Sequence, residues 1–141
     1  MSMTPDDMKS FNQTVIDEFR ANGGETTGPF AGAPLLLLNS TGAKSGETRT
    51  SPVVHTRDGD RYIIIASKAG ADTNPSWYHN LVANPQATIE VGTETIPVVA
   101  TVAEGDERNR LYDAQAALMP NFAEYAEKTT RQIPVFILTP A

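Results

Sequence analysis

Short strand-like runs separated by turn residues constrain the fold of this chain more than any other feature. Residues 35–38 are fully apolar, and residues 61–67 (RYIIIAS) are dense in β-branched side chains. Asp58-Gly59 predicts a tight hairpin between this second run and residues 50–56, because the dipeptide suits a two-residue turn. Further runs follow the same pattern. The six predicted strands are residues 35–38, 50–56, 61–67, 88–91, 95–102 and 132–138.

Helical periodicity lies outside these runs, beginning with apolar residues at spacings of three and four in residues 5–20. Shorter helical patterns cover residues 75–83, 106–118 and 121–128. Because the 141 residues show no repeat or linker, we expect one domain. It comprises a helix and loop in residues 1–30 and a barrel with helices in residues 34–141. Strands in hairpins with helices outside them predict an α+β fold, a small antiparallel β-barrel with peripheral helices.

Charge argues against a nucleic-acid-binding surface. The chain has 11 basic and 17 acidic residues and a net charge of −6, which would repel a polyanion. Residues 40–70 depart from this balance, with five basic and three acidic side chains. A locally basic segment in an acidic protein can hold a small anion through short-range contacts. We therefore expect a small-molecule partner and no nucleic acid.

Cysteine is absent, which excludes disulfides, thiolate nucleophiles and cysteine-ligated metals. No apolar run approaches the roughly 20 residues that span a bilayer, and residues 1–10 lack the pattern of a secretion signal. These features predict a cytoplasmic protein whose amphipathic helix makes at most peripheral contact with a membrane. Both a monomer and a homodimer are compatible with the sequence.

The polar stretch in residues 39–49 (NSTGAKSGETR) is the first candidate site. Two glycines permit a tight backbone, and Lys44, Ser45 and Arg49 supply charge and hydrogen-bond donors. Such a loop can surround a phosphate with backbone N–H groups and a bidentate guanidinium. It lacks the first glycine of the P-loop pattern and no helix follows it, so nucleotide hydrolysis is a poor fit. The other interpretation is a solvated hairpin turn.

Ser67 and Lys68 end the most hydrophobic run. A Ser-Lys catalytic dyad is disfavoured, because adjacent strand residues point to opposite faces. A ligand clamp at the barrel rim and an ordinary strand end are the two interpretations. His55 and His79 have no further ligand at metal-binding spacing, so no metal site is predicted and His55 is interpreted as a sheet residue. Trp77 suits either core packing or a ligand contact.

Met119, Phe122 and Tyr125 recur at a spacing of three near the C-terminus. This spacing places them along one face of a helix, with a phenol at its end. Either the three side chains pack in the core, or they form a lid over an apolar substrate.

Four motifs in order resemble the deazaflavin-dependent nitroreductase family, actinobacterial reductases that use coenzyme F-420. They are TGAKSGETRTSP, DGDRYIIIASKAGA, NPSWYHNLVANP and the terminal RQIPVFIL, and the resemblance spans residues 35–140. Each motif alone is modest, whereas their order and spacing together are specific. The resemblance implies the split β-barrel of flavin-binding proteins, which agrees with the predicted strands.

The resemblance assigns coenzyme contacts to the positions that match the family's motifs. Lys44, Ser45 and Arg49 match residues that hold the coenzyme's phosphate. Ala43 stands where relatives often have a second cation. The positions expected to contact the deazaflavin ring or the rest of the coenzyme are Pro52, Val53, Ser67, Lys68, Trp77 and Asn80.

The implied reaction is hydride transfer from reduced F-420 to an electron-poor acceptor such as a quinone, an enone or a nitroaromatic. Tyr125 is the candidate proton donor, with solvent as the alternative. Relatives that reduce bulky nitroimidazoles and menaquinone carry tyrosines where this chain has Met119 and Phe122. The implied acceptor pocket is therefore more apolar, which favours small enones or simple quinones. Two alternatives stay open: a barrel of the same kind that binds FMN, and a non-catalytic carrier of coenzyme or an apolar ligand.

Overall fold

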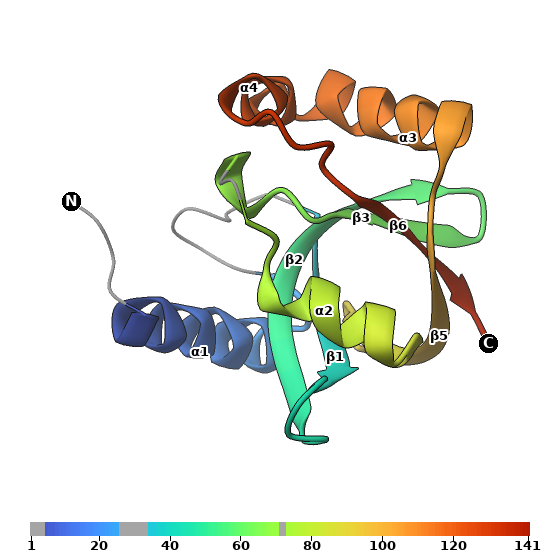
Figure 1. The fold of residues 1–141 in the computed structure, drawn as a ribbon. Helices are drawn as coiled ribbons and strands as arrows, with labels where there is room; N and C mark the ends of the chain where they lie inside the picture. Colours follow the sequence, from blue (N-terminus) through green and yellow to red (C-terminus); the bar gives the residue numbers. More distant parts are fainter. Residues whose placement is uncertain (1–4, 26–33, 71–72) are drawn as a thin grey trace.

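Six antiparallel strands close into a barrel in the computed structural model of this chain (Figure 1). The structure describes residues 5–25, 34–70 and 73–141, so residues 26–30 of the expected N-terminal loop lie outside it. Around the barrel the strand order is β1-β2-β3-β6-β5-β4, and β4 pairs with β1 to close it. The strands are β1 (Leu35–Thr41), β2 (Thr48–Asp58), β3 (Arg61–Ile65), β4 (Gln86–Val91), β5 (Glu94–Val102) and β6 (Val135–Pro140).

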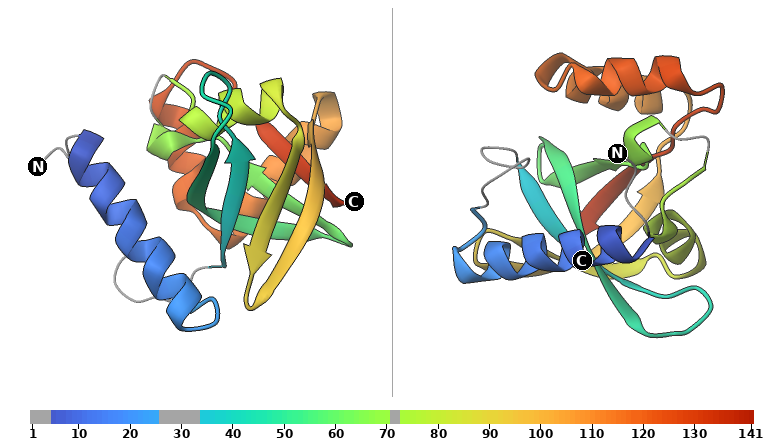
Figure 2. Two further views of the ribbon diagram at one scale, coloured as in Figure 1. Left: turned by 90° about the horizontal axis from the view of Figure 1, so that it is seen from below. Right: turned by 90° about the vertical axis from the view of Figure 1, so that its left-hand side faces the viewer.

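Helices surround this barrel, as the sequence predicted. Those in the described residues are α1 (Pro5–Ala21), the short 3₁₀ turn η2 (Lys68–Gly70), α2 (Ser76–Ala83), α3 (Gly105–Leu118) and α4 (Asn121–Lys128). Helix α1 lies on one side of the barrel, whereas α3 and α4 lie together on the opposite side (Figure 2). None of the described helices is both long and apolar enough to cross a membrane.

Alternation along the strands divides the core into three hydrophobic clusters. In β1, Leu36 and Leu38 belong to the cluster inside the barrel, whereas Leu35 and Leu37 pack outside it against α1. Strands β3 and β6 alternate in the same way, and their outward side chains pack against α3 and α4. A strand that is buried on both faces needs apolar residues at successive positions. This accounts for the uninterrupted apolar run in residues 35–38.

Helix α2 packs against the interior of the barrel. Trp77 and Leu81 belong to the interior cluster, and the Trp77 ring makes an edge contact with Phe136, with 5.7 Å between ring centroids. Core packing, one of the two interpretations of Trp77, therefore describes its side chain. This anchoring sets the position of the rest of α2, including Asn80.

The β1–β2 hairpin is longer than the sequence predicted. Strand β1 includes residues 39–41 and β2 begins earlier than expected, so the loop covers residues 42–47 instead of 39–49. Polar side chains are stable in this ladder because Thr50 donates a hydrogen bond to Asn39 across the strand pair (2.6 Å). Composition alone suggested a loop, since the hydrogen bond that pairs the two side chains is not visible in the sequence.

Strand β3 ends at Ile65 instead of residue 67, and β6 lies further along the chain than predicted, ending at Pro140 instead of residue 138. Strand β6 begins at Val135 instead of residue 132, because Pro134 has no N–H to donate to a ladder. The Pro134 carbonyl instead accepts the N–H of Ala66 at 2.9 Å, just after β3 ends. The two strand ends are therefore joined outside the regular ladder.

Candidate functional site

A cavity of about 800 Å³ opens between α1, α2 and the β1–β2 hairpin. Its lining residues come from three parts of the chain: residues 12–20 in α1, 42–51 in the hairpin and 76–80 in α2. Among the described residues, the lining includes three Lys or Arg side chains and no carboxylate. Because the whole chain has a net charge of −6, this cationic pocket is a local feature.

The β1–β2 loop places backbone donors at this cavity. The N–H of Gly42 donates to Glu47 (2.7 Å) and the N–H of Gly46 donates to Gly42 (2.9 Å), which closes the turn. Gly46 has a φ of +71°, a conformation that favours glycine. The N–H groups of Lys44 and Ser45 make no hydrogen bond with the described residues. Successive free N–H groups in a turn form a concavity that binds anions.

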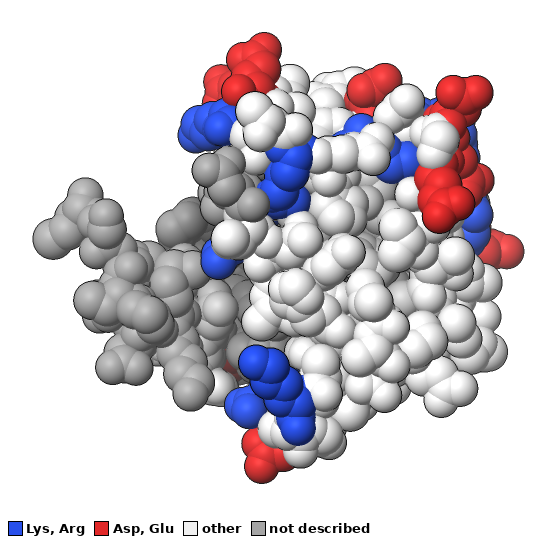
Figure 3. Space-filling model, viewed as in Figure 1, with Lys and Arg blue, Asp and Glu red and all other residues white. Residues whose placement is uncertain are grey.

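Two cations of the hairpin add charge to these donors. Lys44 forms no ion pair with the residues that the structure describes, and it lines the cavity. Arg49 lies 3.4 Å from Glu47, but this pair is weak because both side chains are more than half exposed. Figure 3 shows basic side chains at the bottom of the view, where Figure 1 places the hairpin. An oxyanion at this place meets an ammonium, a guanidinium and backbone donors.

Asn80 fixes the loop against α2. Its side chain is buried, its Oδ1 accepts the N–H of Ala43 (2.9 Å), and its Nδ2 donates to Oγ of Ser40 (3.2 Å). Loss of this amide would leave those partners without their hydrogen bonds. Although Asn80 borders the cavity, both ends of its amide are engaged with the hairpin. The structure thus makes it a support for the loop.

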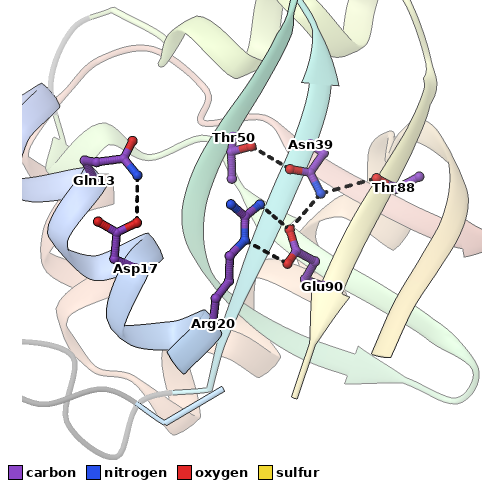
Figure 4. Close-up of polar contacts among 7 residues, drawn as sticks. All are labelled: Gln13, Asp17, Arg20, Asn39, Thr50, Thr88 and Glu90. Atoms are coloured by element: carbon purple, nitrogen blue, oxygen red, sulfur yellow. Dashed lines mark hydrogen bonds and ion pairs between the residues drawn. The ribbon is translucent and has the colours of Figure 1, made fainter. Parts of the chain in front are cut away.

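A polar network ties α1 to the barrel beside the cavity (Figure 4). Arg20 donates two hydrogen bonds to the Glu90 carboxylate, at 3.0 and 2.8 Å. Glu90 also accepts a hydrogen bond from Asn39 (3.0 Å), the same amide that accepts from Thr50. The Arg20 guanidinium lowers the pKa of Glu90, so this carboxylate stays charged further into the acid range. The network holds α1 against β4, with Arg20 in the cavity wall.

The sequence did not indicate the α1 wall of this cavity. Asn12, Ile16 and Arg20 recur every four residues and line it together. That spacing is visible in the sequence, but nothing local shows that this face of α1 meets the β1–β2 hairpin. Glu90 carries no signal either, because 70 residues separate it from Arg20. His79 also lines the cavity, where the sequence offered it only as an isolated histidine.

The cavity brings together four of the nine positions that the resemblance assigned to the coenzyme: Lys44, Ser45, Arg49 and Asn80. The other five do not line it. Val53 and Trp77 are buried in the barrel interior. Pro52 is half-buried in β2, directly after the strand residues that line the cavity. Ser67 is buried and Lys68 is exposed at the end of β3, where η2 contacts α4.

The residues assigned to an acceptor pocket lie at α4 and the end of α3. Phe122 is 6% exposed and belongs to the cluster between α3, α4 and the barrel. Met119 and Tyr125 are half-buried and pack against the same cluster. The Tyr125 hydroxyl accepts an exposed hydrogen bond from Asn121 at 2.9 Å. Core packing therefore describes the Phe122 side chain, whereas the phenol of Tyr125 lies at the solvent edge of α4.

No group of three His, Asp or Glu side chains at metal-binding distance occurs in the described part of the chain. His55 is a buried sheet residue, as predicted, with its ring 5.8 Å from that of Tyr62. Burial lowers the pKa of His55 to about 4, and its Nδ1 has no partner among the described residues. The ammonium of Lys68 donates to the Thr73 hydroxyl (3.3 Å), which gives no support to a dyad with Ser67.

Comparison with known proteins places this geometry in a family. The model of the F420H(2)-dependent quinone reductase family matches residues 11–140. The chain belongs to this family. A Mycobacterium tuberculosis F420H(2)-dependent quinone reductase, Rv1261c, is 39% identical over 125 residues, which cover 86% of this chain and 84% of the relative. Members of the family are oxidoreductases, and the reductant that gives the family its name is reduced F-420.

Solved structures agree with membership of the quinone reductase family. One, described as an F420-H2 dependent reductase (FDR-A), is 40% identical with a TM-score of 0.70, and the match covers 74% of this chain and 93% of that one. Another, a domain-swapped dimer, is 34% identical with a TM-score of 0.71, and the match covers 96% of this chain and 99% of that one. A heme storage protein and a FAD-binding protein, which are 19% and 11% identical, share the fold alone. The predicted split β-barrel is confirmed, and F-420 is favoured over FMN.

Proposed function

We propose that this protein transfers a hydride from reduced F-420 to a quinone or a similar electron-poor acceptor. Family membership supports the coenzyme and the class of reaction, and the mycobacterial relative supports a quinone as acceptor. The observation that carries the proposal is the cavity lined by Lys44 and Arg49, where free backbone donors accompany two cations. For the finer acceptor range, the apolar Met119 and Phe122 favour small enones and simple quinones over bulky nitroaromatics.

The donor set of the cavity fits the anionic part of F-420, which carries a phosphodiester and carboxylates. Lys44, Arg49 and the Ser45 N–H would hold the phosphate, and Asn80 would keep the loop in place. A volume of about 800 Å³ lies within the range of small-molecule sites. By the resemblance, Pro52, Val53, Ser67 and Lys68 would lie beside the ring, and Trp77 would make a further coenzyme contact. The Trp77 side chain packs in the core, where it anchors α2.

Bound reduced F-420 supplies the hydride. The protein's own residues therefore bind and orient the coenzyme and the acceptor, and they exclude water. The acceptor must also gain a proton, since a quinone becomes a hydroquinone only with both. We propose Tyr125 as the donor of that proton. It lies on α4 where this helix meets η2, because a Cβ on Gly70 would stand 3.1 Å from the Tyr125 carbonyl.

Replacement of Tyr125 by Phe tests the source of the proton. The variant keeps the ring that packs 5.3 Å from Phe122 and loses the hydroxyl that accepts from Asn121. We expect kcat with menadione to fall about tenfold or more, since general acids contribute roughly 10²–10⁴. The affinity for F-420 should stay within about twofold. An unchanged kcat would assign the proton to solvent.

A fluorescence titration with F-420, run beside FMN, tests the proposed function directly. We expect saturable binding of F-420 and weak binding of FMN. Lys44→Ala and Arg49→Ala should each weaken F-420 binding by on the order of 1.5–3 kcal/mol, the scale of a hydrogen bond to a charged group. Oxidation of reduced F-420 with menadione and cyclohexenone then separates a reductase from a carrier.

Arg57→Ala is the matched control for the two cavity variants. Arg57 is an exposed cation in the same strand as Arg49, but it stacks over the Tyr62 ring and does not line the cavity. Its removal changes the net charge equally and should leave F-420 affinity unaltered. Unchanged affinity in both cavity variants would contradict the phosphate assignment. Preference for FMN would overturn the coenzyme, and binding of neither would contradict the function.

We also propose that the protein is a homodimer in the cytoplasm. The domain-swapped dimer among the solved relatives supports the dimer, and the molar mass in solution distinguishes it from a monomer. Because the chain has no cysteine, it has no disulfide that would require an oxidising compartment.

A further inference from the structure

The end of β3 leads into a backbone conformation that residues other than glycine avoid. Lys68, the first residue of η2, has a φ of +46° and is the one described residue besides glycines with a positive φ. In this left-handed region a side chain crowds the backbone, so the conformation persists only where surrounding contacts hold it. The contacts around Lys68 must therefore stabilise this backbone conformation.

Arg131 supplies one set of these contacts. Its Nη2 donates to the carbonyl oxygens of Ala66 (3.2 Å) and Ser67 (2.9 Å), and its Nη1 donates to Oδ1 of Asn74 (2.8 Å). The N–H of Ala66 donates to the Pro134 carbonyl at 2.9 Å. The segment from Arg131 to Pro134 thus holds both the donor and the acceptor of Ala66, beyond the last pair of the β3–β6 ladder.

Helix α4 supplies the second set of contacts. Gly70, the last residue of η2, lies so close to α4 that a Cβ would stand 3.1 Å from the Lys128 side chain and from the Tyr125 carbonyl. Arg131 comes three positions after Lys128, which ends α4. The helix and the guanidinium therefore support η2 and the residues before it from neighbouring points of the chain.

A guanidinium suits this task better than an ammonium does. Its planar fork offers five N–H donors in fixed directions and keeps its charge at all ordinary pH values. Here it reaches three oxygens that belong to two separate stretches, residues 66–67 and Asn74. A lysine at the same position would have to bind these oxygens as a flexible point charge.

We propose that Arg131 is a positioning residue for the coenzyme. By fixing the carbonyls of Ala66 and Ser67, it sets the direction of the Ser67–Lys68 strand end, which the family resemblance places at the deazaflavin ring. It also links that strand end to α4, the helix that carries Tyr125. The inference rests on the proposed function, because the strand end has a coenzyme to orient only if the protein binds F-420.

Variants of Arg131 test this role, with Arg108 as a matched control. Arg108 also donates two hydrogen bonds to a main-chain carbonyl before β6, that of Ile133 (3.2 and 2.7 Å), but it reaches from α3. The set is Arg131→Met, Arg131→Lys and Arg108→Lys, each measured below its melting temperature. Readouts are amide hydrogen exchange in residues 66–70 without coenzyme, the Kd for F-420, and kcat and KM with menadione.

We expect faster exchange in residues 66–70 in both Arg131 variants. In Arg108→Lys we expect unchanged exchange in residues 67–70; Ala66 is left out of this comparison because its N–H binds Pro134, directly after the carbonyl that Arg108 holds. Arg131→Met should raise the Kd for F-420 about tenfold and lower kcat, with the KM for menadione changed less than about twofold. Arg131→Lys should recover part of both losses. Arg108→Lys should lower the melting temperature and leave the Kd within about twofold.

Unchanged exchange in the Arg131 variants would overturn the inference without reference to any coenzyme. Equal losses of F-420 affinity in Arg131→Lys and Arg108→Lys would also overturn it, since they would reflect general destabilisation. A wild-type chain that does not bind F-420 would contradict the proposed function and, with it, the coenzyme part of the inference. The exchange measurement would still decide whether Arg131 holds the strand end.

Discussion

At the scale of single residues, His55 places a titratable group inside the barrel. It is 7% exposed, and burial lowers its pKa from 6.5 to about 4. The Arg57 charge lowers it further, while the Pro34 backbone opposes the shift. His55 therefore gains its proton near pH 6.5 in the unfolded chain, but only near pH 4 in the folded chain. Stability is fully present above the unfolded value and is lost as the pH falls through this window.

We expect the free energy of unfolding to fall by about 2 kcal/mol between about pH 7.5 and about pH 5, measured by urea denaturation. His55→Leu should flatten this slope, because it removes the titrating group. His79→Leu is the comparison variant, since it removes an exposed histidine and leaves the buried one in place. Arg110 and Arg61 lower the pKa of Asp58 to about 2, so protonation of this carboxyl affects stability only at lower pH. An equal slope in His55→Leu would contradict the assignment.

At the scale of elements, the sequence revealed strands and local hairpins better than their assembly. The β2–β3 turn could be predicted because Asp58-Gly59 suits it, and Gly59 indeed has a φ of +61°. Apolar runs marked β1, β3 and β6, since helices cover the outer faces of these strands. Barrel closure, by contrast, depends on the pairing of β1 with β4 and of β3 with β6. No local pattern shows either pairing.

The same division holds for the candidate site. Lys44 and Arg49 could be identified because one short stretch of sequence carries both charge and glycines. The wall contributed by α1 could not be identified from the sequence. The hydrogen bonds that hold Arg20 in this wall go to Glu90, which is 70 residues away. Asn80 could be singled out by motif, but its hydrogen bonds to the hairpin could only come from the structure. The sequence motifs thus indicated where the candidate site lies, whereas the long-range contacts of its residues could be seen only in the structure.

At the scale of the whole molecule, the charge of the cavity opposes the charge of the protein. If F-420 binds in this cavity as proposed, the net charge of −6 would repel the anionic coenzyme at long range, whereas Lys44 and Arg49 would attract it at contact. Salt shortens the distance over which charges act, from about 30 Å at 0.01 M to about 10 Å at 0.1 M. Low salt is therefore the range in which distant carboxylates matter. Further salt then weakens the exposed contacts themselves, since the Arg49 side chain is 51% exposed.

Above about 0.1 M salt, where distant repulsion is already screened, we expect the Kd for F-420 to rise with salt, about threefold to tenfold by about 0.5 M. Lys44→Ala should bind more weakly and depend less on salt, because one attracting charge is gone. Asp113→Asn changes the net charge by one unit on α3, on the side of the barrel opposite α1, and should keep the wild-type dependence. Fluorescence titrations at several salt concentrations measure these slopes. A Kd that falls with salt over this range would mean that the overall negative charge, rather than the cationic cavity, governs coenzyme binding.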